Sequence, residues 1–268
     1  MAADATDAAQ TRKACQGADV VYQCATPPYS DWPELFPPIQ KGVIAGAAAA
    51  QAKLVVPENL YMYGPVTGPM TEDLPYRPTT RKGRVRAAMT EELMRAHQKG
   101  IVRATSGRAS DFYGPYAGSQ GIFGDRVLRP LLAGKKVSLV GSLDMPHTYT
   151  YIEDFARGLI ALGEHEEALG QSWHIPNAPT LTGREMLTMF FEEAGLPPKM
   201  GVLSGGMIKV LGHINRLIHE VDEMLYEFQQ PFIVDTSKFV HAFGNLSTPH
   251  REAVRQTLTW FKAHYAEQ

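Results

Sequence analysis

Short apolar stretches alternate along the first half of the chain with longer segments in which apolar residues recur at helical spacing. The short stretches are rich in Val, Ile, Leu and Tyr and predict strands, because β-branched and aromatic residues favour an extended backbone. The longer segments predict helices, the first of which ends at Gly17. Strands are predicted within 18–25, 53–64 and 101–115, and helices within 7–17, 33–52 and 80–97.

The second half of the chain is less regular. Helices are predicted within 121–134, 152–165, 182–195, 204–228 and 247–266, with one or two strands in 135–151 and one in 172–179. Alternation of buried strands and helices is typical of βα units on a parallel sheet. We therefore predict an α/β fold.

Composition excludes several classes of partner. The 268 residues carry a formal net charge of −2 and a sequence pI near 6.5, so we expect no nucleic-acid partner. No apolar run reaches the roughly 18 residues of a membrane helix, so we expect no membrane partner. Two cysteines, Cys15 and Cys24, are too few for a disulfide framework and favour a cytoplasmic location. The nine histidines show no ligand spacing, and no metal site is predicted.

A basic cluster begins the helix predicted within 80–97. Arg81, Lys82, Arg84 and Arg86 lie within its first turns, and Lys82 and Arg86 have the i, i+4 spacing that places two side chains on one helix face. The cluster is either a solvated helix start, a site for a phosphate or carboxylate, or part of a catalytic site. The pattern alone leaves all three interpretations open.

Five stretches, in order along the chain, carry a family resemblance. They are "ADATD" (3–7), "ADVVYQCAT" (18–26), "ENLYMYGP" (58–65), "GRASDFYGP" (107–115) and "TYIEDFARGL" (150–159). Together they resemble the extended short-chain dehydrogenase/reductase family, the NAD-dependent epimerase/dehydratase group. The resemblance implies a Rossmann-like parallel sheet with helices on both faces in residues 1–115. It also implies a smaller, mainly substrate-binding and C-terminal helical part in 116–268, packed on the sheet.

The resemblance also implies a cofactor, NAD or NADP, and a small-molecule substrate. By position, the adenine and ribose would contact Asp4, Ala5, Ala25 and Thr26. Asn59 stands where the family carries a catalytic serine or threonine, and an amide can hydrogen-bond a substrate carbonyl. The residues implied in substrate binding are Asp111, Tyr113 and His147, although a lone histidine or a turn aspartate is often structural.

The first departure from the family lies at the start of the chain. The family begins with a strand and a glycine-rich turn that leads into a helix holding the cofactor pyrophosphate. Here Gly17 is the first glycine, and by comparison with the family we expect the chain to start at about the end of the family's third strand. We therefore expect an N-terminally truncated sheet whose strand within 18–25 lies at an edge.

The second departure is the absence of Tyr-x-x-x-Lys, the family's proton-transfer pair, anywhere in the chain. In one register Lys82 and Arg86 take the two places, and in the other Gly83 and Ala87 do. The first register is preferred because it keeps two functional side chains on one helix face. Tyr61 is a further candidate to supply the missing phenol, against the alternative of a buried core tyrosine.

The resemblance therefore predicts an NAD(P)-dependent oxidoreductase or epimerase with an atypical catalytic site. Its substrate would be a small carbonyl, an alcohol or a nucleotide-sugar-like compound. The alternatives are a non-catalytic relative that binds a dinucleotide or metabolite, and an inactive truncated fragment. The family also implies a homodimer, formed through the helix that carries the basic cluster.

Overall fold

The computed structural model describes residues 2–203 and 223–265. The chain forms two compact units, each built from separate segments. Unit 1 comprises Met1–Pro65, Glu72–Ala109 and Arg157–Ile175, and unit 2 comprises Val66–Thr71, Ser110–Ala156 and Pro176–Gln268. The sequence-based division placed one boundary at 115/116, whereas the units change at Ala109/Ser110 and the chain later returns to unit 1.

A parallel sheet forms the centre of unit 1. Its order is β1-β2-β3-β8, and all neighbouring strands are parallel. The strands are β1 (Val20–Tyr22), β2 (Lys53–Glu58), β3 (Arg103–Arg108) and β8 (Ser172–His174). In the described part of the chain β1 pairs with β2 alone, so it is an edge strand, as the sequence predicted. The register places Glu58 at the end of β2 beside Arg108 at the end of β3.

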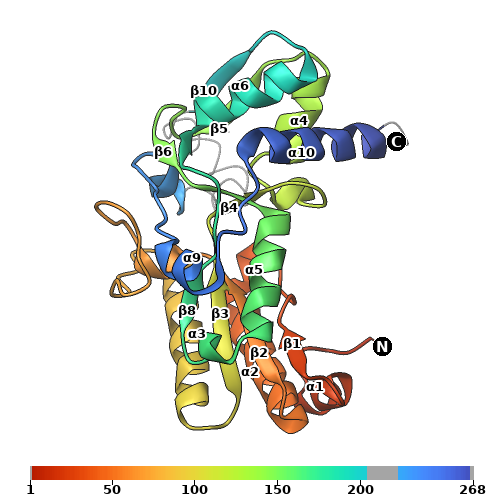
Figure 1. The fold of residues 1–268 in the computed structure, drawn as a ribbon, viewed down its shortest axis with the longest axis vertical. Helices are drawn as coiled ribbons and strands as arrows, with labels where there is room; N and C mark the ends of the chain where they lie inside the picture. The colour runs from red at the N-terminus through yellow and green to blue at the C-terminus, as the bar shows by residue number, and fades with distance from the viewer. Residues whose placement is uncertain (1, 204–222, 266–268) are drawn as a thin grey trace. The chain divides into compact units, whose positions relative to one another are not determined.

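Helices cover both faces of this sheet (Figure 1). One face packs α2 and α3 through a cluster of apolar side chains that includes Val43, Leu54, Val56, Leu93 and Ala104. On the other face the second half of α5 lies close to the sheet, since a Cβ on Gly107 would come within 2.6 Å of Leu159. The helices are α1 (Ala8–Cys15), α2 (Trp32–Ala50), α3 (Arg81–Gln98) and α5 (Ile152–Glu164), with short 3-10 turns at Tyr29–Asp31, Tyr61–Tyr63 and Glu166–Ala168.

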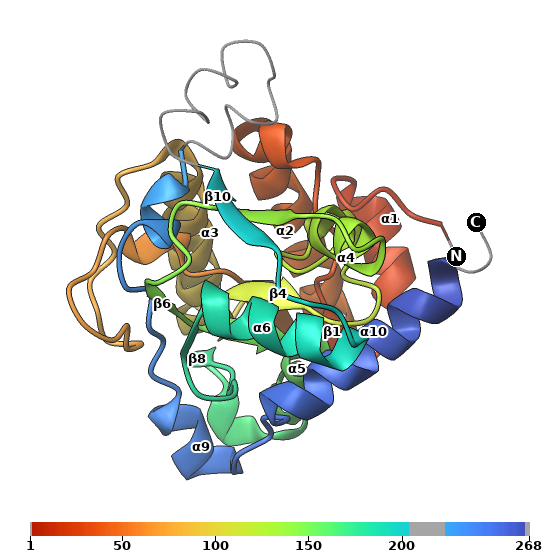
Figure 2. The ribbon, with the colours of Figure 1, turned by 90° about the horizontal axis from the view of Figure 1, so that it is seen from above.

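Unit 2 consists of three two-stranded sheets and four helices in the described residues. β4 (Asp111–Tyr113) pairs in parallel with β7 (Tyr149–Tyr151), β5 (Val137–Val140) in parallel with β10 (Met200–Leu203), and β6 (Pro146–His147) antiparallel with β9 (Leu181–Thr182). The helices are α4 (Asp125–Leu132), α6 (Gly183–Ala194), α9 (Ser237–Phe243) and α10 (His250–Tyr265), and 3-10 turns lie at Gly118–Gln120 and Leu225–Phe228. Figure 2 shows α10 beside α6.

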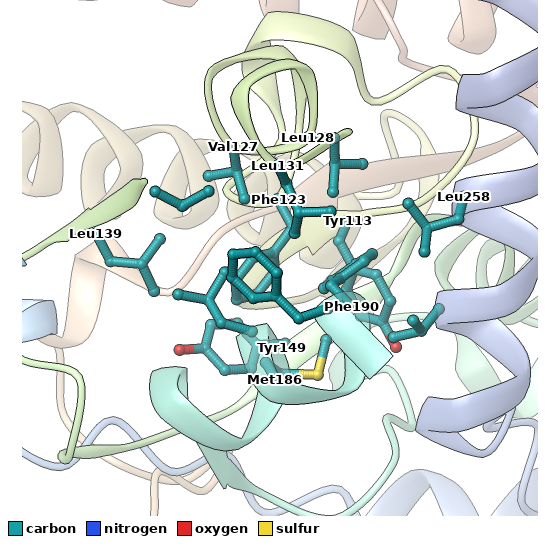
Figure 3. Close-up of a cluster of buried hydrophobic side chains, with 14 of the residues drawn as sticks. Tyr113, Phe123, Val127, Leu128, Leu131, Leu139, Tyr149, Met186, Phe190 and Leu258 are labelled. Atoms are coloured by element: carbon teal, nitrogen blue, oxygen red, sulfur yellow. The ribbon is translucent and has the colours of Figure 1, made fainter. Parts of the chain in front are cut away.

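An aromatic core holds unit 2 together (Figure 3). The ring of Phe123 lies 4.9 Å from that of Tyr149 and 5.4 Å from that of Phe190, measured between centroids. Leu139 and Met186 are buried in the same cluster, together with apolar residues of α10. Such fully buried aromatic side chains each remove a large apolar area from water and stabilise the unit.

The predicted α/β class with a parallel sheet is confirmed. The prediction of one strand within 101–115 was wrong, because β3 ends at Arg108 in one unit and β4 begins at Asp111 in the other. The segment 135–151 holds three strands instead of one or two. Most of the helical region predicted within 204–228 lies outside the described residues. None of the described helices is long and apolar enough to cross a membrane.

Candidate active site

The turn after β2 brings the first candidate side chains together. The Asn59 side-chain carbonyl accepts a hydrogen bond from the backbone N–H of Tyr61 at 3.3 Å. Asparagine commonly closes such a turn on the backbone two residues ahead. This bond holds the start of the 3-10 turn and gives Asn59 a local structural role at the strand end.

The start of α3 directs two cations into unit 1. The Thr80 hydroxyl caps the helix by accepting a bond from Gly83 N–H at 3.0 Å. Lys82 and Arg86 then lie on the buried face, with 0% and 1% of their surface exposed. A Cβ on Gly83 would lie 2.6 Å from the Tyr61 carbonyl oxygen. The helix start therefore has room for a side chain at 82 but not at 83.

Lys82 lies against a pair of tyrosines. Its Nζ is 4.4 Å from the ring centroid of Tyr29, over the aromatic face, where the ring quadrupole attracts a cation. The hydroxyl of Tyr29 is 3.3 Å from that of Tyr61. Trp32 packs edge-on against Tyr29, at 5.0 Å between centroids. The predicted candidates Lys82, Tyr61 and Asn59 thus belong to one cluster, which Tyr29 joins.

Tyr29 was missed by the sequence analysis. It lies in the 3-10 turn that leads from the end of β1 into α2. Side chains that follow the carboxyl ends of parallel strands commonly line ligand sites in α/β folds. The aromatic residue of "PPYSDW", following a predicted strand, was therefore a readable signal.

Arg86 has a different environment from Lys82. Its NH2 lies 3.6 Å from Glu58 Oε1 and donates a hydrogen bond to the Pro57 carbonyl at 3.1 Å. Its guanidinium carbon lies 4.9 Å from the ring centroid of Phe36. Burial lowers the pKa of Arg86, opposed by the Glu58 carboxylate, and an arginine stays charged under such a shift. Arg86 is therefore held in a buried ion pair.

Glu58 is the centre of a buried network that the sequence analysis also missed. Arg108 Nε donates to Glu58 Oε2 at 3.0 Å, and the Thr90 hydroxyl donates to Oε1 at 2.5 Å. Burial by itself would raise the pKa of Glu58, but the charges of Arg108 and Arg86 outweigh it and hold the pKa below its usual value. The readable signal was a glutamate and an arginine, each at the end of a predicted buried strand.

The network continues through phenols to a histidine. Arg108 donates to the hydroxyls of Tyr63 and Tyr76, both at 2.5 Å. The Tyr63 hydroxyl lies 2.8 Å from His174 Nε2, and the backbone N–H of His174 donates to Glu72 at 2.8 Å. Burial raises the pKa of Tyr63, against the lowering effect of Arg108. A phenol held neutral in this way is a structural link and a poor proton donor near neutral pH.

In unit 2 the structure joins two of the three residues expected to bind substrate. His147 Nε2 lies 2.8 Å from Asp111 Oδ2. Tyr113 is instead part of the aromatic core (Figure 3), with its hydroxyl 3.2 Å from His250 Nδ1. Burial raises the pKa of the Tyr113 hydroxyl far above its ordinary value, and the negative charge of Asp154 raises it further.

The residues expected to contact the cofactor lie on the surface of unit 1. Asp4, Ala25 and Thr26 are exposed, and Ala5 is partly buried against α2. Asp4 Oδ1 accepts hydrogen bonds from the Thr6 N–H and hydroxyl, both at 2.8 Å, and the backbone bond is the main reason for its lowered pKa. Ala25 and Thr26 follow the carboxyl end of β1, the edge where α/β sheets hold nucleotides.

Comparison with known proteins gives the family. The NAD dependent epimerase/dehydratase family matches residues 1–175, well over half of the chain. The chain belongs to this family. Its members form a class of NAD-dependent epimerases and dehydratases. A search of curated proteins finds no significant match.

Solved structures of other proteins share the fold of this chain over nearly its whole length. The NAD-bound dTDP-glucose 4,6-dehydratase DesIV of Streptomyces venezuelae has a TM-score of 0.79 at 17% identity, over 98% of this chain and 79% of that one. The UDP-glucuronic acid 4-epimerase of Bacillus cereus in complex with NAD has a TM-score of 0.76 at 18% identity, over 97% and 80%. RMD of Pseudomonas aeruginosa complexed with NADPH has a TM-score of 0.76 at 12% identity, over 98% and 88%.

No group of three or more histidine, cysteine or acidic side chains suited to a metal ion occurs in residues 2–203 and 223–265.

Proposed function

We propose that this family member is an NAD(P)-dependent oxidoreductase or epimerase in which Lys82 takes the proton-transfer part of the family's tyrosine. Its substrate would be a small carbonyl, an alcohol or a nucleotide-sugar-like compound. The proposal rests on the buried Lys82 ammonium 4.4 Å from the centre of the Tyr29 ring. Free lysine and tyrosine have similar pKa values, about 10.4 and about 10, so either can exchange a proton with a substrate oxygen.

The surroundings of Lys82 support this role. The Tyr29 and Tyr61 hydroxyls are 3.3 Å apart, so a proton can pass between them and solvent. Both phenols are partly exposed, while the lysine beside them is buried. Lack of room at Gly83 favours the Lys82/Arg86 register over the Gly83/Ala87 register.

The residues expected to contact the cofactor suit that role. The exposed Asp4 carboxylate and Thr26 hydroxyl suit hydrogen bonds to adenine and ribose, beside Ala5 and Ala25. Arg86, the candidate for the lysine place of the family's pair, is buried and paired with Glu58, so its guanidinium already has an anionic partner within unit 1. When bound, the nicotinamide would supply hydride transfer to and from the substrate carbon.

A second candidate is a non-catalytic relative that binds a dinucleotide or metabolite. The Arg86–Glu58 ion pair favours it, because the cation at the family's lysine position serves the core of unit 1. Binding without turnover would identify this second function.

The test combines binding with turnover. Isothermal titration of the full chain with NAD(H) and NADP(H) is followed by assays with dTDP-glucose, UDP-glucuronic acid and a panel of small aldehydes and alcohols. We expect binding, and turnover that falls by about two orders of magnitude or more in Lys82→Met, the usual scale of a lost proton-transfer group. Lys99→Met, an exposed lysine just beyond the same helix, is the matched control and keeps full activity.

The outcomes separate the alternatives. Absence of binding by all four nucleotides contradicts the enzyme and a dinucleotide-binding relative, and leaves only a relative that binds another metabolite. Binding of a nucleotide without turnover of any substrate in the panel supports the non-catalytic relative. Turnover that survives Lys82→Met removes Lys82 from the mechanism and leaves the class of enzyme unchanged.

A further inference from the structure

His250 joins three segments of unit 2 that are distant in sequence. It is the first residue of α10, and only 8% of its surface is exposed. Its Nε2 lies 2.8 Å from the backbone carbonyl oxygen of Pro179. Its Nδ1 lies 3.2 Å from the hydroxyl of Tyr113 in β4. One buried imidazole ring therefore connects the start of α10 to β4 and to the segment 176–180.

The two contacts determine which ring nitrogen carries the hydrogen. A backbone carbonyl only accepts, so Nε2 carries a hydrogen and donates it to Pro179. Burial raises the pKa of the Tyr113 hydroxyl, so the phenol keeps its proton and can donate it to Nδ1. Both contacts are satisfied by the neutral imidazole with a bare Nδ1.

Three features disfavour a positive charge on this ring. Burial removes the water that would solvate an imidazolium, and it lowers the pKa of His250. A hydrogen on Nδ1 would take the place of the one that Tyr113 donates. The ring also stands at the N-terminus of the 16-residue helix α10, where the helix dipole repels a cation.

The groups that favour the charged ring are weaker. The bond to the Pro179 carbonyl and the charge of Asp154 in α5 both raise the pKa of His250, but burial outweighs them. Asp154 also accepts hydrogen bonds from the N–H and the hydroxyl of Thr248, each at 2.7 Å. Among the described residues, Asp154 and Tyr113 are thus the ionisable groups that face His250 from the neighbouring elements.

Apolar contacts hold the later turns of α10. Ala253, Val254, Leu258 and Phe261 are buried in the hydrophobic cluster of unit 2. These contacts do not depend on the protonation of any side chain. Loss of the His250 contacts would therefore free the first turn of α10 and leave the rest of the helix packed.

We propose that His250 is an acid-released latch for the start of α10. In its neutral form the ring ties the first turn of the helix to β4 and to the segment 176–180. Uptake of one proton from solvent at Nδ1 ends the bond from Tyr113 and releases this turn. The inference concerns unit 2 alone and its test uses no nucleotide or substrate, so it and the proposed function fail separately.

The pH range follows from the direction of the shift. The pKa of His250 is lower in the folded state than in the unfolded chain, where it is about 6.5. The contribution of the latch to stability is therefore complete above about pH 6.5 and is lost as pH falls through the folded value. Because one proton is taken up, opening of the latch increases by at most about ten-fold per pH unit. Measurements above about pH 5 avoid the titration of ordinary carboxyl groups, near pH 4.

Hydrogen exchange of the full chain, read by mass spectrometry, measures the release. The readout is the exchange rate of residues 245–256 in wild type divided by that in His250→Gln at the same pH, which cancels the intrinsic pH dependence of exchange. We expect this ratio to rise as pH falls from about 7.5 to about 5, by up to about ten-fold per pH unit, and to stay constant in β2 and β3. His241→Gln, at an exposed histidine of α9, is the matched control, and the ratio of wild type to this variant stays constant.

An NMR titration of the full chain labelled with ¹⁵N-histidine, assigned with His250→Gln, follows the ring itself. We expect a protonated Nε2 and a bare Nδ1 at neutral pH, and a titration midpoint below about 6.5. A hydrogen on Nδ1 at neutral pH, a midpoint at or above that value, or an exchange ratio that does not change with pH would overturn the proposal. If His250→Gln fails to fold, the wild-type exchange of residues 245–256 relative to β2 and β3 at each pH decides the question.

Discussion

Arg86, which we propose at the lysine position of the family's catalytic pair, is held in the core of unit 1. Its guanidinium shares the Glu58 carboxylate with Arg108, and the three side chains are almost fully buried. Two cations on one anion are tolerated because the Pro57 carbonyl and the Tyr63 and Tyr76 hydroxyls accept further bonds. The burial of both arginine charges therefore depends on the Glu58 carboxylate.

We predict that Glu58→Gln strongly destabilises the chain. The variant keeps the shape of the side chain but leaves two buried guanidiniums without an anion. Breaking such a pair by removing one partner costs about 3–5 kcal/mol. Urea denaturation near neutral pH, followed by circular dichroism, measures the loss of unfolding free energy. Glu166→Gln, an exposed carboxylate bonded to Lys53 and Arg103, is the control and leaves the midpoint nearly unchanged.

The difference in unfolding free energy between wild type and Glu58→Gln should depend on pH. The pKa of Glu58 is lower in the folded state than in the unfolded chain. Its contribution to stability is therefore complete above the unfolded value of about 4.3 and is lost as pH falls through the folded value. The stability gap between wild type and Glu58→Gln should narrow in acid. A gap that stays constant from neutral to strongly acidic pH would contradict the role given to Glu58.

At the scale of elements, the packing on α2 of α1 and of the residues just before it depends on two glycines. A Cβ on Gly42 would lie 2.1 Å from the Ala5 carbonyl oxygen, and one on Gly46 would lie 2.8 Å from the Thr11 carbonyl oxygen. The Thr11 hydroxyl also donates to the Gly42 carbonyl at 2.7 Å. Backbone contact at this distance leaves no flexible atom to move aside, so only glycine fits.

Gly42→Ala is therefore expected to destabilise the chain although alanine is the better helix former. Alanine gains about 1 kcal/mol of helix propensity over glycine, but overpacking against a backbone costs about 1–3 kcal/mol. Thermal unfolding compares Gly42→Ala with Ala49→Gly, an exposed position of α2 where only propensity acts. An increase in melting temperature for Gly42→Ala would show that the segment before α1 does not pack closely there.

At the scale of the whole molecule, the two units have separate hydrophobic clusters. Leu54 is fully buried in the cluster of unit 1, and Phe190 is fully buried in that of unit 2. Leu54→Ala should cost about 2–5 kcal/mol and Phe190→Ala about 3–5 kcal/mol, because each leaves a cavity. Hydrogen exchange read by mass spectrometry should then rise mainly in β2 and β3 for the first variant and in α6 and β7 for the second. Equal acceleration throughout the chain for both variants would show that the units unfold as one.

The pattern of apolar positions was enough to predict the elements of the parallel sheet and its covering helices. The helices predicted within 33–52 and 80–97 occur close to those bounds, and the strands predicted within 18–25 and 53–64 occur there but are shorter. The spacing of apolar side chains and the residues that end a helix are local properties, so they can be recognised within one segment of sequence. The same local motifs, in order, were enough to predict the family.

The partners of the charged and aromatic residues were set by packing between distant segments. Glu58 meets Thr90 and Arg108 across 32 and 50 residues of sequence, and Tyr29 meets Tyr61 across 32. Nothing local distinguishes Lys82 from Arg86, four residues apart on the same helix face. The packing of α3 against the end of β2 places Arg86 beside the Glu58 carboxylate, whereas the turn after β1 places a phenol beside Lys82. Desolvation makes the pairings of Glu58 specific, because a buried charge without its partner is too costly to keep.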